Sequence, residues 1–295
     1  MSDPAIPAAV SANRRRLALA GLLALGGCSS LLPKPTEKSA TKPKIGLALG
    51  GGAARGFAHI GVIKMLESQG IVPDYIVGTS AGAVVGSLYA AGYDAFAMQK
   101  IAQQMDEKVF ADWTFTGRGF LKGEALQDFV NQYLKNRPLQ SLNKPFATVA
   151  CDLKTGERVV FRTGDAGLAV RASAAVPGVF LPTQFSGRTF VDGGLASPVP
   201  VLAAREMGAD FIIAVDISAK PDGQPFDTLP AVMWQTLSIM GSAISANELK
   251  HADVVIRPDL GYVKSWDFNA RNQAMLEGER AALAAIPAIR QKLGR

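Results

Sequence analysis

Short apolar runs alternate with helical patterns along most of this chain, and this alternation constrains the fold more than any other feature. The run Phe211–Val215 is apolar throughout, as expected for a parallel strand that is covered on both faces. The apolar runs Ile45–Leu49 and Tyr75–Val77 each lead into a turn and then into a segment with helical periodicity. Strands that alternate with helices predict an α/β fold of three layers (α/β/α), in which a mainly parallel central sheet lies between two layers of helices.

The same reasoning places the other regular elements. Helices are expected where apolar residues recur every three or four positions, and Gly70 and Gly92 close two of them. We expect Pro287 to kink or break the last helix, because proline lacks an amide hydrogen and its ring clashes with the preceding turn. The expected helices span 55–69, 81–91 and 273–293, the further strands span 146–151, 158–161 and 253–256, and 218–229 is expected to be a loop.

Residues 1–27 have the organisation of a secretory signal peptide. Arg14–Arg16 precede the apolar run Leu17–Leu25, and small residues follow before Cys28. The run is too short to cross a membrane, which takes about 20 apolar residues. The segment Leu25–Cys28 also resembles a bacterial lipobox, and this resemblance implies that Cys28 is lipidated and becomes the first mature residue. A plain cleaved signal and an incidental cysteine after an apolar N-terminus are the alternatives.

Residues 28–43 are rich in serine, threonine, proline and lysine, a composition typical of flexible tethers. The pattern of strands and helices starts at Lys44, so we expect one folded domain over 44–295. Ser29 follows the lipobox cysteine and is similar to the sorting residue of lipoproteins that reach the outer membrane. We therefore expect an exported lipoprotein that is anchored in a membrane, here the outer membrane, and faces the periplasm.

Charge and composition exclude several classes of function. The net charge is only +6 over 295 residues, and no dense run of lysine and arginine with interleaved aromatic residues is present, so a nucleic-acid partner is not expected. The excess of positive charge either favours an anionic membrane surface or serves ordinary solubility. Two cysteines, Cys28 and Cys151, do not make a disulfide framework, and no clustered His, Cys or Asp suggests a metal or another cofactor. The sequence does not predict the oligomeric state.

The segment Gly78–Gly82 has the sequence Gly-Thr-Ser-Ala-Gly and matches the Gly-x-Ser-x-Gly pattern of a nucleophile elbow. A predicted strand precedes it and a predicted helix follows it, which is the context that such an elbow requires. Ser80 would lie in a strained turn at a helix N-terminus, and Gly78 and Gly82 would leave room for close backbone contacts. We predict that Ser80 is a nucleophile; a chance match in a turn of small residues is the alternative.

A second glycine-rich segment, Gly50–Gly56, also lies between a strand and a helix. The amide groups of such a turn point together and bind an anion, which in an acyl hydrolase would be the oxyanion. Phosphate or dinucleotide binding competes with this interpretation, but the Lys-Ser/Thr of a P-loop is missing and no ribose-binding acid follows. Arg55 either steadies this loop, holds an anionic head group or is an ordinary surface charge. The expected oxyanion hole consists of Gly50, Gly51, Gly52, Ala53 and Arg55.

A serine nucleophile needs a base, and the two histidines are poorly placed to act as one. His59 lies in the helix after the glycine-rich segment and His251 in a polar stretch before a strand, so we expect both to be structural. A carboxylate can act as the base if partial burial raises its pKa. Asp192 is the best candidate, because it ends a strand-like segment and is followed by Gly193 and Gly194. Taken alone, this motif is also typical of a plain turn.

The three motifs, in this order, resemble those of the patatin-like phospholipases. That family combines a glycine-rich oxyanion loop, a Gly-x-Ser-x-Gly elbow and an Asp-Gly-Gly or Asp-Gly-Ala motif, here Gly50–Gly56, Gly78–Gly82 and Asp192–Gly194. The segment Arg171–Phe180 also resembles the stretch before the aspartate in bacterial members. The resemblance covers residues 44–283 and is strongest to the branch related to the catalytic domain of neuropathy target esterase.

The resemblance implies a patatin-like fold and a serine acyl-ester hydrolase with a Ser80–Asp192 dyad and no metal or cofactor. Ser80 would attack the acyl carbonyl, Asp192 would accept its proton, and water would release a fatty acid from the acyl-enzyme. Phospholipids or lysophospholipids are the substrates that the family implies. A hydrolase of short esters or thioesters, and a lipoprotein that binds lipid or a partner with little turnover, are the alternatives. The aromatic segment Asp112–Gly123 is expected to be a lid or an ordinary loop, and Cys151 a buried strand residue.

Overall fold

The computed structural model describes residues 42–105, 112, 114, 120–219, 227–264 and 267–294, and the chain from Lys42 onward forms one compact unit. The predicted signal peptide, Cys28 and half of the predicted lid segment lie outside the described residues. The strands are β1 (Ile45–Leu49), β2 (Tyr75–Thr79), β3 (Phe146–Asp152), β4 (Arg158–Phe161), β5 (Thr183–Phe185), β6 (Arg188–Asp192), β7 (Phe211–Val215) and β8 (Val254–Ile256). The helices are α1 (Phe57–Ser68), α2 (Ala81–Ala90), α3 (Ala95–Gln104), α4 (Glu124–Leu134), α5 (Ala166–Ser173), α6 (Val201–Glu206), α7 (Leu229–Glu248) and α8 (Arg271–Leu293).

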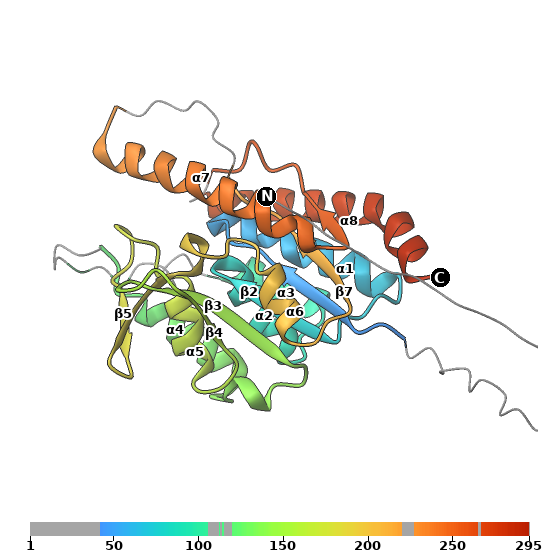
Figure 1. The fold of residues 1–295 in the computed structure, drawn as a ribbon, viewed down its shortest axis with the longest axis horizontal. Helices are drawn as coiled ribbons and strands as arrows, with labels where there is room; N and C mark the ends of the chain where they lie inside the picture. Colours follow the sequence, from blue (N-terminus) through green and yellow to red (C-terminus); the bar gives the residue numbers. More distant parts are fainter. Residues whose placement is uncertain are drawn as a thin grey trace, which may run out of the picture. The chain divides into compact units, whose positions relative to one another are not determined.

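All of these strands belong to one sheet, in the order β5-β6-β3-β2-β1-β7-β8, with β4 paired to β3 (Figure 1). From β3 to β8 in this order, neighbouring strands run parallel. Strands β4, β5 and β6 add antiparallel pairs on one side. The sheet is therefore mixed, with the predicted parallel strands at its centre.

Hydrophobic cores cover both faces of the sheet. On one face, Leu47, Leu49 and Ile213 pack with apolar residues of α1, α2, α3, α4, α5 and α8. On the other face, Ala48 and Ile212 pack with apolar residues of α6. Successive strand residues point to opposite faces, so both kinds of position must be apolar in a strand that helices cover on both sides. The predicted three-layer α/β/α arrangement is confirmed.

The structure differs from the expectation at Pro287, where α8 continues without a break. The proline side chain is exposed, whereas Ile286 and Ile289 are buried on either side of it. Packing of both flanking turns against the core outweighs the loss of one backbone hydrogen bond. Among the helices of the described residues, none is both long enough and apolar enough to cross a membrane.

Helices α1 and α8 cross at two glycines whose backbones touch the partner helix. A Cβ atom on Gly61 would lie 1.9 Å from the carbonyl oxygen of Met275, and one on Gly278 would lie 2.0 Å from the carbonyl oxygen of Ala58. No side chain fits at either position, although glycine weakens a helix interior by about 0.5–1 kcal/mol relative to alanine. The close crossing holds α8, the last element of the fold, against α1, which carries His59.

We expect Gly61→Ala or Gly278→Ala to lower the free energy of unfolding by about 1–3 kcal/mol, because an added methyl group forces the helices apart. Gly241→Ala is the matched control, since Gly241 also lies inside a helix and an added Cβ would be 3.8 Å from its nearest neighbour atom. The control should leave stability unchanged or raise it slightly. Urea unfolding of the three variants measures this, and equal behaviour of all three would contradict the close crossing.

Candidate active site

The residues that the motifs single out meet at one edge of the sheet. Gly50 follows the carboxyl end of β1, Ser80 follows the carboxyl end of β2, and Asp192 ends β6. Open α/β sheets bind ligands at this edge, outside the carboxyl ends of their strands. Two cavities open here; Ser80 lines both of them, and Asp192 lines one.

Ser80 has the backbone geometry of a strained turn. Its φ is 53° and its ψ is −118°, a conformation that non-glycine residues rarely adopt away from functional sites. The two elbow glycines make close packing of this turn possible. A Cβ atom on Gly82 would lie 2.1 Å from the carbonyl oxygen of Leu49, and one on Gly78 would lie 2.4 Å from the carbonyl oxygen of Gly82. Both glycines are therefore required by sterics, as the sequence predicted.

Two hydroxyl groups hold the elbow in place. The amide of Ser80 donates a hydrogen bond to Ser173 Oγ at 2.9 Å, and the Ser173 hydroxyl donates to the carbonyl oxygen of Val149 at 2.5 Å. On the other side, the Thr79 hydroxyl donates to the carbonyl oxygen of Ser197 at 2.9 Å. The elbow is thus tied to α5, to β3 and to the turn that follows Asp192.

Asp192 is a buried carboxyl group next to Ser80. Its Oδ1 accepts a hydrogen bond from the amide of Gly194 at 2.7 Å, whereas Oδ2 has no hydrogen-bond partner within normal geometric limits among the described residues. Burial raises the pKa of Asp192 to about 6, and the nearby Ser80 hydroxyl and the Gly194 amide partly offset this effect. Gly193 brings the turn close to β3, since a Cβ atom there would lie 2.1 Å from the carbonyl oxygen of Val149.

The first part of the glycine-rich loop is held by backbone hydrogen bonds. The amide of Gly50 donates to the carbonyl oxygen of Val215 at 3.0 Å, and that of Gly51 donates to the carbonyl oxygen of Pro198 at 2.9 Å. His59 Nε2 donates to the carbonyl oxygen of Gly50 at 2.8 Å. Complete burial lowers the pKa of His59 to about 4, so the ring is neutral at neutral pH. His59 therefore anchors the loop.

The second part of the loop differs from the first in the hydrogen bonds of its amide groups. Among the described residues, no acceptor is found for the amides of Gly52 and Ala53. Ala53 starts a short 3₁₀ helix (Ala53–Gly56) and has a φ of 52°, another strained backbone next to Ser80. Arg55 donates its amide to the carbonyl oxygen of Gly52 at 3.1 Å and its Nε to that of Val263 at 3.0 Å. Of the predicted oxyanion set, Gly52 and Ala53 have free donors, whereas Gly50, Gly51 and Arg55 use their amides to shape the loop.

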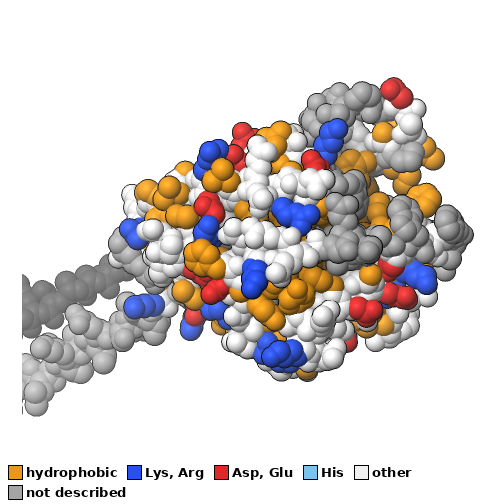
Figure 2. Space-filling model, turned by 180° about the vertical axis from the view of Figure 1, so that it is seen from behind, with side chains coloured by type: hydrophobic (Ala, Val, Ile, Leu, Met, Phe, Trp, Pro, Cys, Tyr) orange, Lys and Arg blue, Asp and Glu red, His pale blue; other side chains and the backbone are white. Residues whose placement is uncertain are grey.

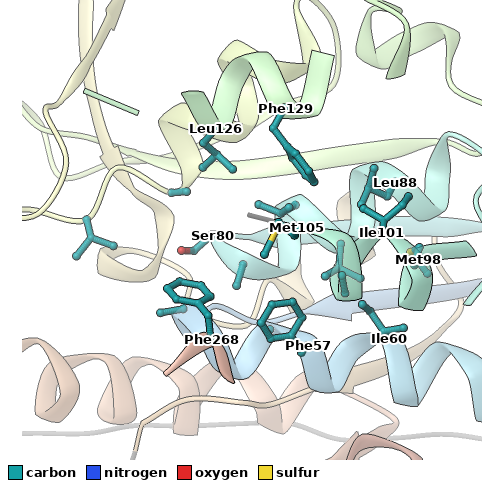
Figure 3. A pocket seen from close by; sticks show the side chains of 18 of the residues that line it. Phe57, Ile60, Ser80, Leu88, Met98, Ile101, Met105, Leu126, Phe129 and Phe268 are labelled. Atoms are coloured by element: carbon teal, nitrogen blue, oxygen red, sulfur yellow. The ribbon is translucent and has the colours of Figure 1, made fainter. Parts of the chain in front are cut away.

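One cavity beside Ser80 is apolar and has a volume of about 100 Å³. Figure 3 shows Ser80 on one side of it and Leu88, Met98 and Ile101 toward the opposite side. Ser80 is the only hydrogen-bonding side chain among the described residues that line this cavity. A cavity of this kind accommodates a hydrocarbon chain rather than a polar ligand.

The other cavity, of about 130 Å³, contains the polar groups of the site. Asp192 and Arg55 are its charged side chains, and no histidine lines either cavity among the described residues. Helix α7 forms one wall through Trp234, Leu237 and Gly241. Asp192 is thus the only carboxylate among the described residues that line a cavity together with Ser80.

A buried acid connects α7 to the turn after Asp192. The Ser197 hydroxyl donates to Glu248 Oε2 at 2.8 Å, and the amide of Leu202 donates to Glu248 Oε1 at 3.0 Å. Burial raises the pKa of Glu248. The last turn of α7 is therefore attached to the segment that positions Asp192 and Thr79.

The structure thus brings together Ser80, Asp192 and the glycine-rich loop, while Cys28 lies outside the described residues. Cys151 is a buried residue of β3, as predicted. The motifs did not single out Ser173 or the Ser197–Glu248 pair. Ser173 lies in the Ala-rich segment before the aspartate, where a lone hydroxyl among small residues is the one signal that could have marked it.

Comparisons with known proteins identify the family of this chain. The family described as patatin-like phospholipase matches residues 47–205. An NTE family protein of Mycobacterium tuberculosis is 37% identical over 220 residues, which cover 73% of this chain and 61% of that protein. Lysophospholipase NTE1 of Yarrowia lipolytica is 29% identical over 232 residues, which cover 75% of this chain and 16% of that protein. This chain therefore spans less than two thirds of the length of these relatives.

The fold is also similar to that of solved structures. The crystal structure of VipD from Legionella pneumophila matches with a TM-score of 0.50 and 14% identity, covering 84% of this chain and 67% of that one. ExoU from Pseudomonas aeruginosa, solved in complex with SpcU, matches with a TM-score of 0.50 and 13% identity, covering 86% of this chain and 53% of that one. These likenesses concern the fold. The family model matches more than half of the chain, and this chain therefore belongs to the patatin-like phospholipase family.

Proposed function

We propose that this protein is a serine acyl-ester hydrolase that releases fatty acids from phospholipids or lysophospholipids. One observation carries the proposal: Ser80 lies beside the buried Asp192 and at the same time lines an apolar cavity. Asp192 supplies a base for Ser80, and the apolar cavity supplies a place for an acyl chain. A hydrolase of short esters would not need such a cavity.

The chemistry follows from the positions of the side chains. Asp192 takes the proton of the Ser80 hydroxyl as Ser80 Oγ attacks the acyl carbonyl, and the amides of Gly52 and Ala53 bind the oxyanion. When the tetrahedral intermediate collapses, the proton passes from Asp192 to the leaving alcohol and an acyl-enzyme remains. Water then attacks the acyl-enzyme, again with Asp192 as the base; as this second tetrahedral intermediate collapses, the proton passes from Asp192 to Ser80 Oγ and the fatty acid leaves.

The substrate class is supported by the surface around the site as well as by the family. Helix α7, one wall of the catalytic cavity, carries no charged residue before Glu248. Figure 2 shows hydrophobic side chains on the projecting end of this helix, at the upper right. An apolar surface next to the catalytic cavity suits a substrate that resides in a membrane. The large exposed apolar residues of α7 in the described part of the chain are Leu229, Val232, Met233, Ile239 and Met240.

The same proposal includes an anchor at Cys28, by which the exported protein is held on the periplasmic side of the outer membrane. It is supported by the lipobox-like segment Leu25–Cys28, the apolar run before it and the tether-like composition after it. A lipidated residue on a flexible tether would keep the site near its substrate, since each buried CH₂ of an acyl chain adds about 0.8 kcal/mol of membrane affinity.

Ser80→Ala and Asp192→Asn are each expected to lower kcat/KM for lysophospholipid by about 10³-fold or more, because they remove the nucleophile and the base. His59→Gln should keep most of the activity, since a glutamine amide can still donate to the Gly50 carbonyl. Fatty-acid release by the full chain measures all three. Inactivity of a folded His59→Gln protein would contradict a dyad without histidine.

The same assay separates the competing functions. Release from long-chain lysophospholipid in preference to short p-nitrophenyl esters supports the proposal, whereas the reverse order supports a hydrolase of short esters. If the wild-type protein cleaves none of these substrates but binds lipid as tightly as Ser80→Ala does, the lipid-binding alternative holds.

The pH dependence of kcat/KM should have an acidic limb near pH 6. The base must be ionised, and burial raises the pKa of Asp192 to about 6, so activity rises with pH through this value and is lost below it. An activity profile between pH 4 and 8 tests this with a substrate that does not titrate in that range. A limb near pH 4 would show that the carboxylate is not desolvated in the working enzyme.

Cys28→Ala should abolish incorporation of labelled palmitate and release the protein from the membrane fraction, while kcat toward a soluble ester stays within about twofold. Cys151→Ala is the matched control, and it should leave labelling unchanged because Cys151 is buried in β3. Labelling that survives Cys28→Ala would show that the lipobox resemblance is accidental.

A further inference from the structure

A large polar cavity adjoins the pocket that holds Ser80 and Asp192. Its volume is about 570 Å³, whereas that pocket has about 130 Å³. Both cavities are lined by Arg55, Ser218 and Ser242, so they meet along these side chains. A ligand group that leaves the catalytic pocket on this side enters the polar cavity directly.

The wall of the polar cavity contains buried hydroxyl groups without partners. Ser245 is 3% exposed, and its Oγ forms no hydrogen bond among the described residues. The Oγ of Ser218 is also buried and has no hydrogen-bond partner in the described part of the chain. Buried polar groups in native proteins are normally hydrogen-bonded, so these two hydroxyls mark this wall of the cavity as a polar one.

Two arginine side chains in the lining of the polar cavity favour binding of an anion. Arg257 lines it and donates Nε to Asp216 Oδ2 at 3.2 Å, with about half of its side chain exposed (54%). Arg55 lines it as well, and a guanidinium group matches phosphate oxygens in geometry and charge. The carboxylates Asp216 and Asp259 also belong to the lining, so the cavity is not a purely cationic site.

We propose that this cavity binds the glycerophosphodiester head group of the lipid substrate. The inference rests on the proposed function and adds the part of the substrate that the acyl cavity does not hold. The acyl chain occupies the apolar cavity, the ester lies at Ser80, and the phosphodiester lies near Arg55 and Arg257. The carboxylate of Asp259 then faces the positive amine of a zwitterionic head group.

Helix α7 lines both the pocket of Ser80 and Asp192 and the polar cavity, and it offers a position from which a larger side chain can fill the polar cavity. Ala246 lines the cavity and is exposed, so a larger side chain fits there without disturbing the core. Ala243 lies one turn earlier on the same helix, is also exposed, and is not among the described residues that line the three cavities. Ala246→Phe and Ala243→Phe therefore form a matched pair of variants.

The experiment compares two substrates with the same acyl chain, lysophosphatidylcholine and monoacylglycerol, of which only the first has a phosphodiester. Ala246→Phe and Arg257→Gln in the full chain should raise KM for lysophosphatidylcholine about tenfold, with kcat changed less than twofold. KM for monoacylglycerol should stay the same. Ala243→Phe and Arg280→Gln, an exposed arginine elsewhere, should behave like the wild type.

Equal effects of the variants on both substrates, or no effect on either, would overturn the proposal. A wild-type protein that cleaves neither substrate would instead contradict the proposed function. Calorimetric titration with glycerophosphocholine needs no turnover and keeps the two failures apart, because Ala246→Phe should weaken its binding in any case. If inorganic phosphate binds as tightly as glycerophosphocholine and Ala246→Phe affects both alike, the site serves free phosphate and the head-group proposal fails.

Discussion

The contact between Gly82 and the carbonyl oxygen of Leu49 is the constraint on which the rest of the site depends. With no side chain at Gly82, the first turn of α2 lies directly on the end of β1, and an added Cβ atom would be only 2.1 Å from the carbonyl oxygen. This approach places Ser80 against the glycine-rich loop, where a Cβ atom on Gly51 would lie 3.2 Å from that of Ser80. The strained backbone of Ser80 persists because Ser173 and the packing around it hold the turn.

In the proposed mechanism, a buried carboxyl group takes the part that a histidine has in other serine hydrolases. The carboxyl group of Asp192 is desolvated, so its pKa moves toward neutrality and it becomes a better base for an alcohol. The buried histidine takes a different part, because its low pKa keeps it neutral and lets it hold the loop through the carbonyl of Gly50. The amides of Gly50 and Gly51 fix the shape of the glycine-rich loop, whereas those of Gly52 and Ala53 have no acceptor within the described part of the chain.

Helix α7 lies along both the pocket that holds Ser80 and Asp192 and the polar cavity. Its last turn is fixed to the segment after Asp192 through Glu248 and Ser197, while its middle lines the catalytic pocket and its hydroxyls reach the polar cavity. The sequence pattern did not predict this helix. In α7 only Ser245 and Glu248 are buried among the described side chains, so its apolar residues show no period of a core-facing helix. Ser173 was missed for a related reason. It lies 93 positions from Ser80, whose amide donates the hydrogen bond that Ser173 Oγ accepts.

By itself the sequence determined the parallel strands at the centre of the sheet, the helices after β1 and β2, and the motifs that place Ser80, the glycine-rich loop and Asp192. These features depend on residues within a few positions of each other. The central strands are recognised because both of their faces are apolar, and the motifs are recognised because glycines are required in their tight turns. The tertiary structure decided which loop amides stay free, how far burial moves the pKa of Asp192, that α8 passes through Pro287, and where the cavities lie. Each of these depends on groups far apart in the chain, whose distances exist only after the layers have packed.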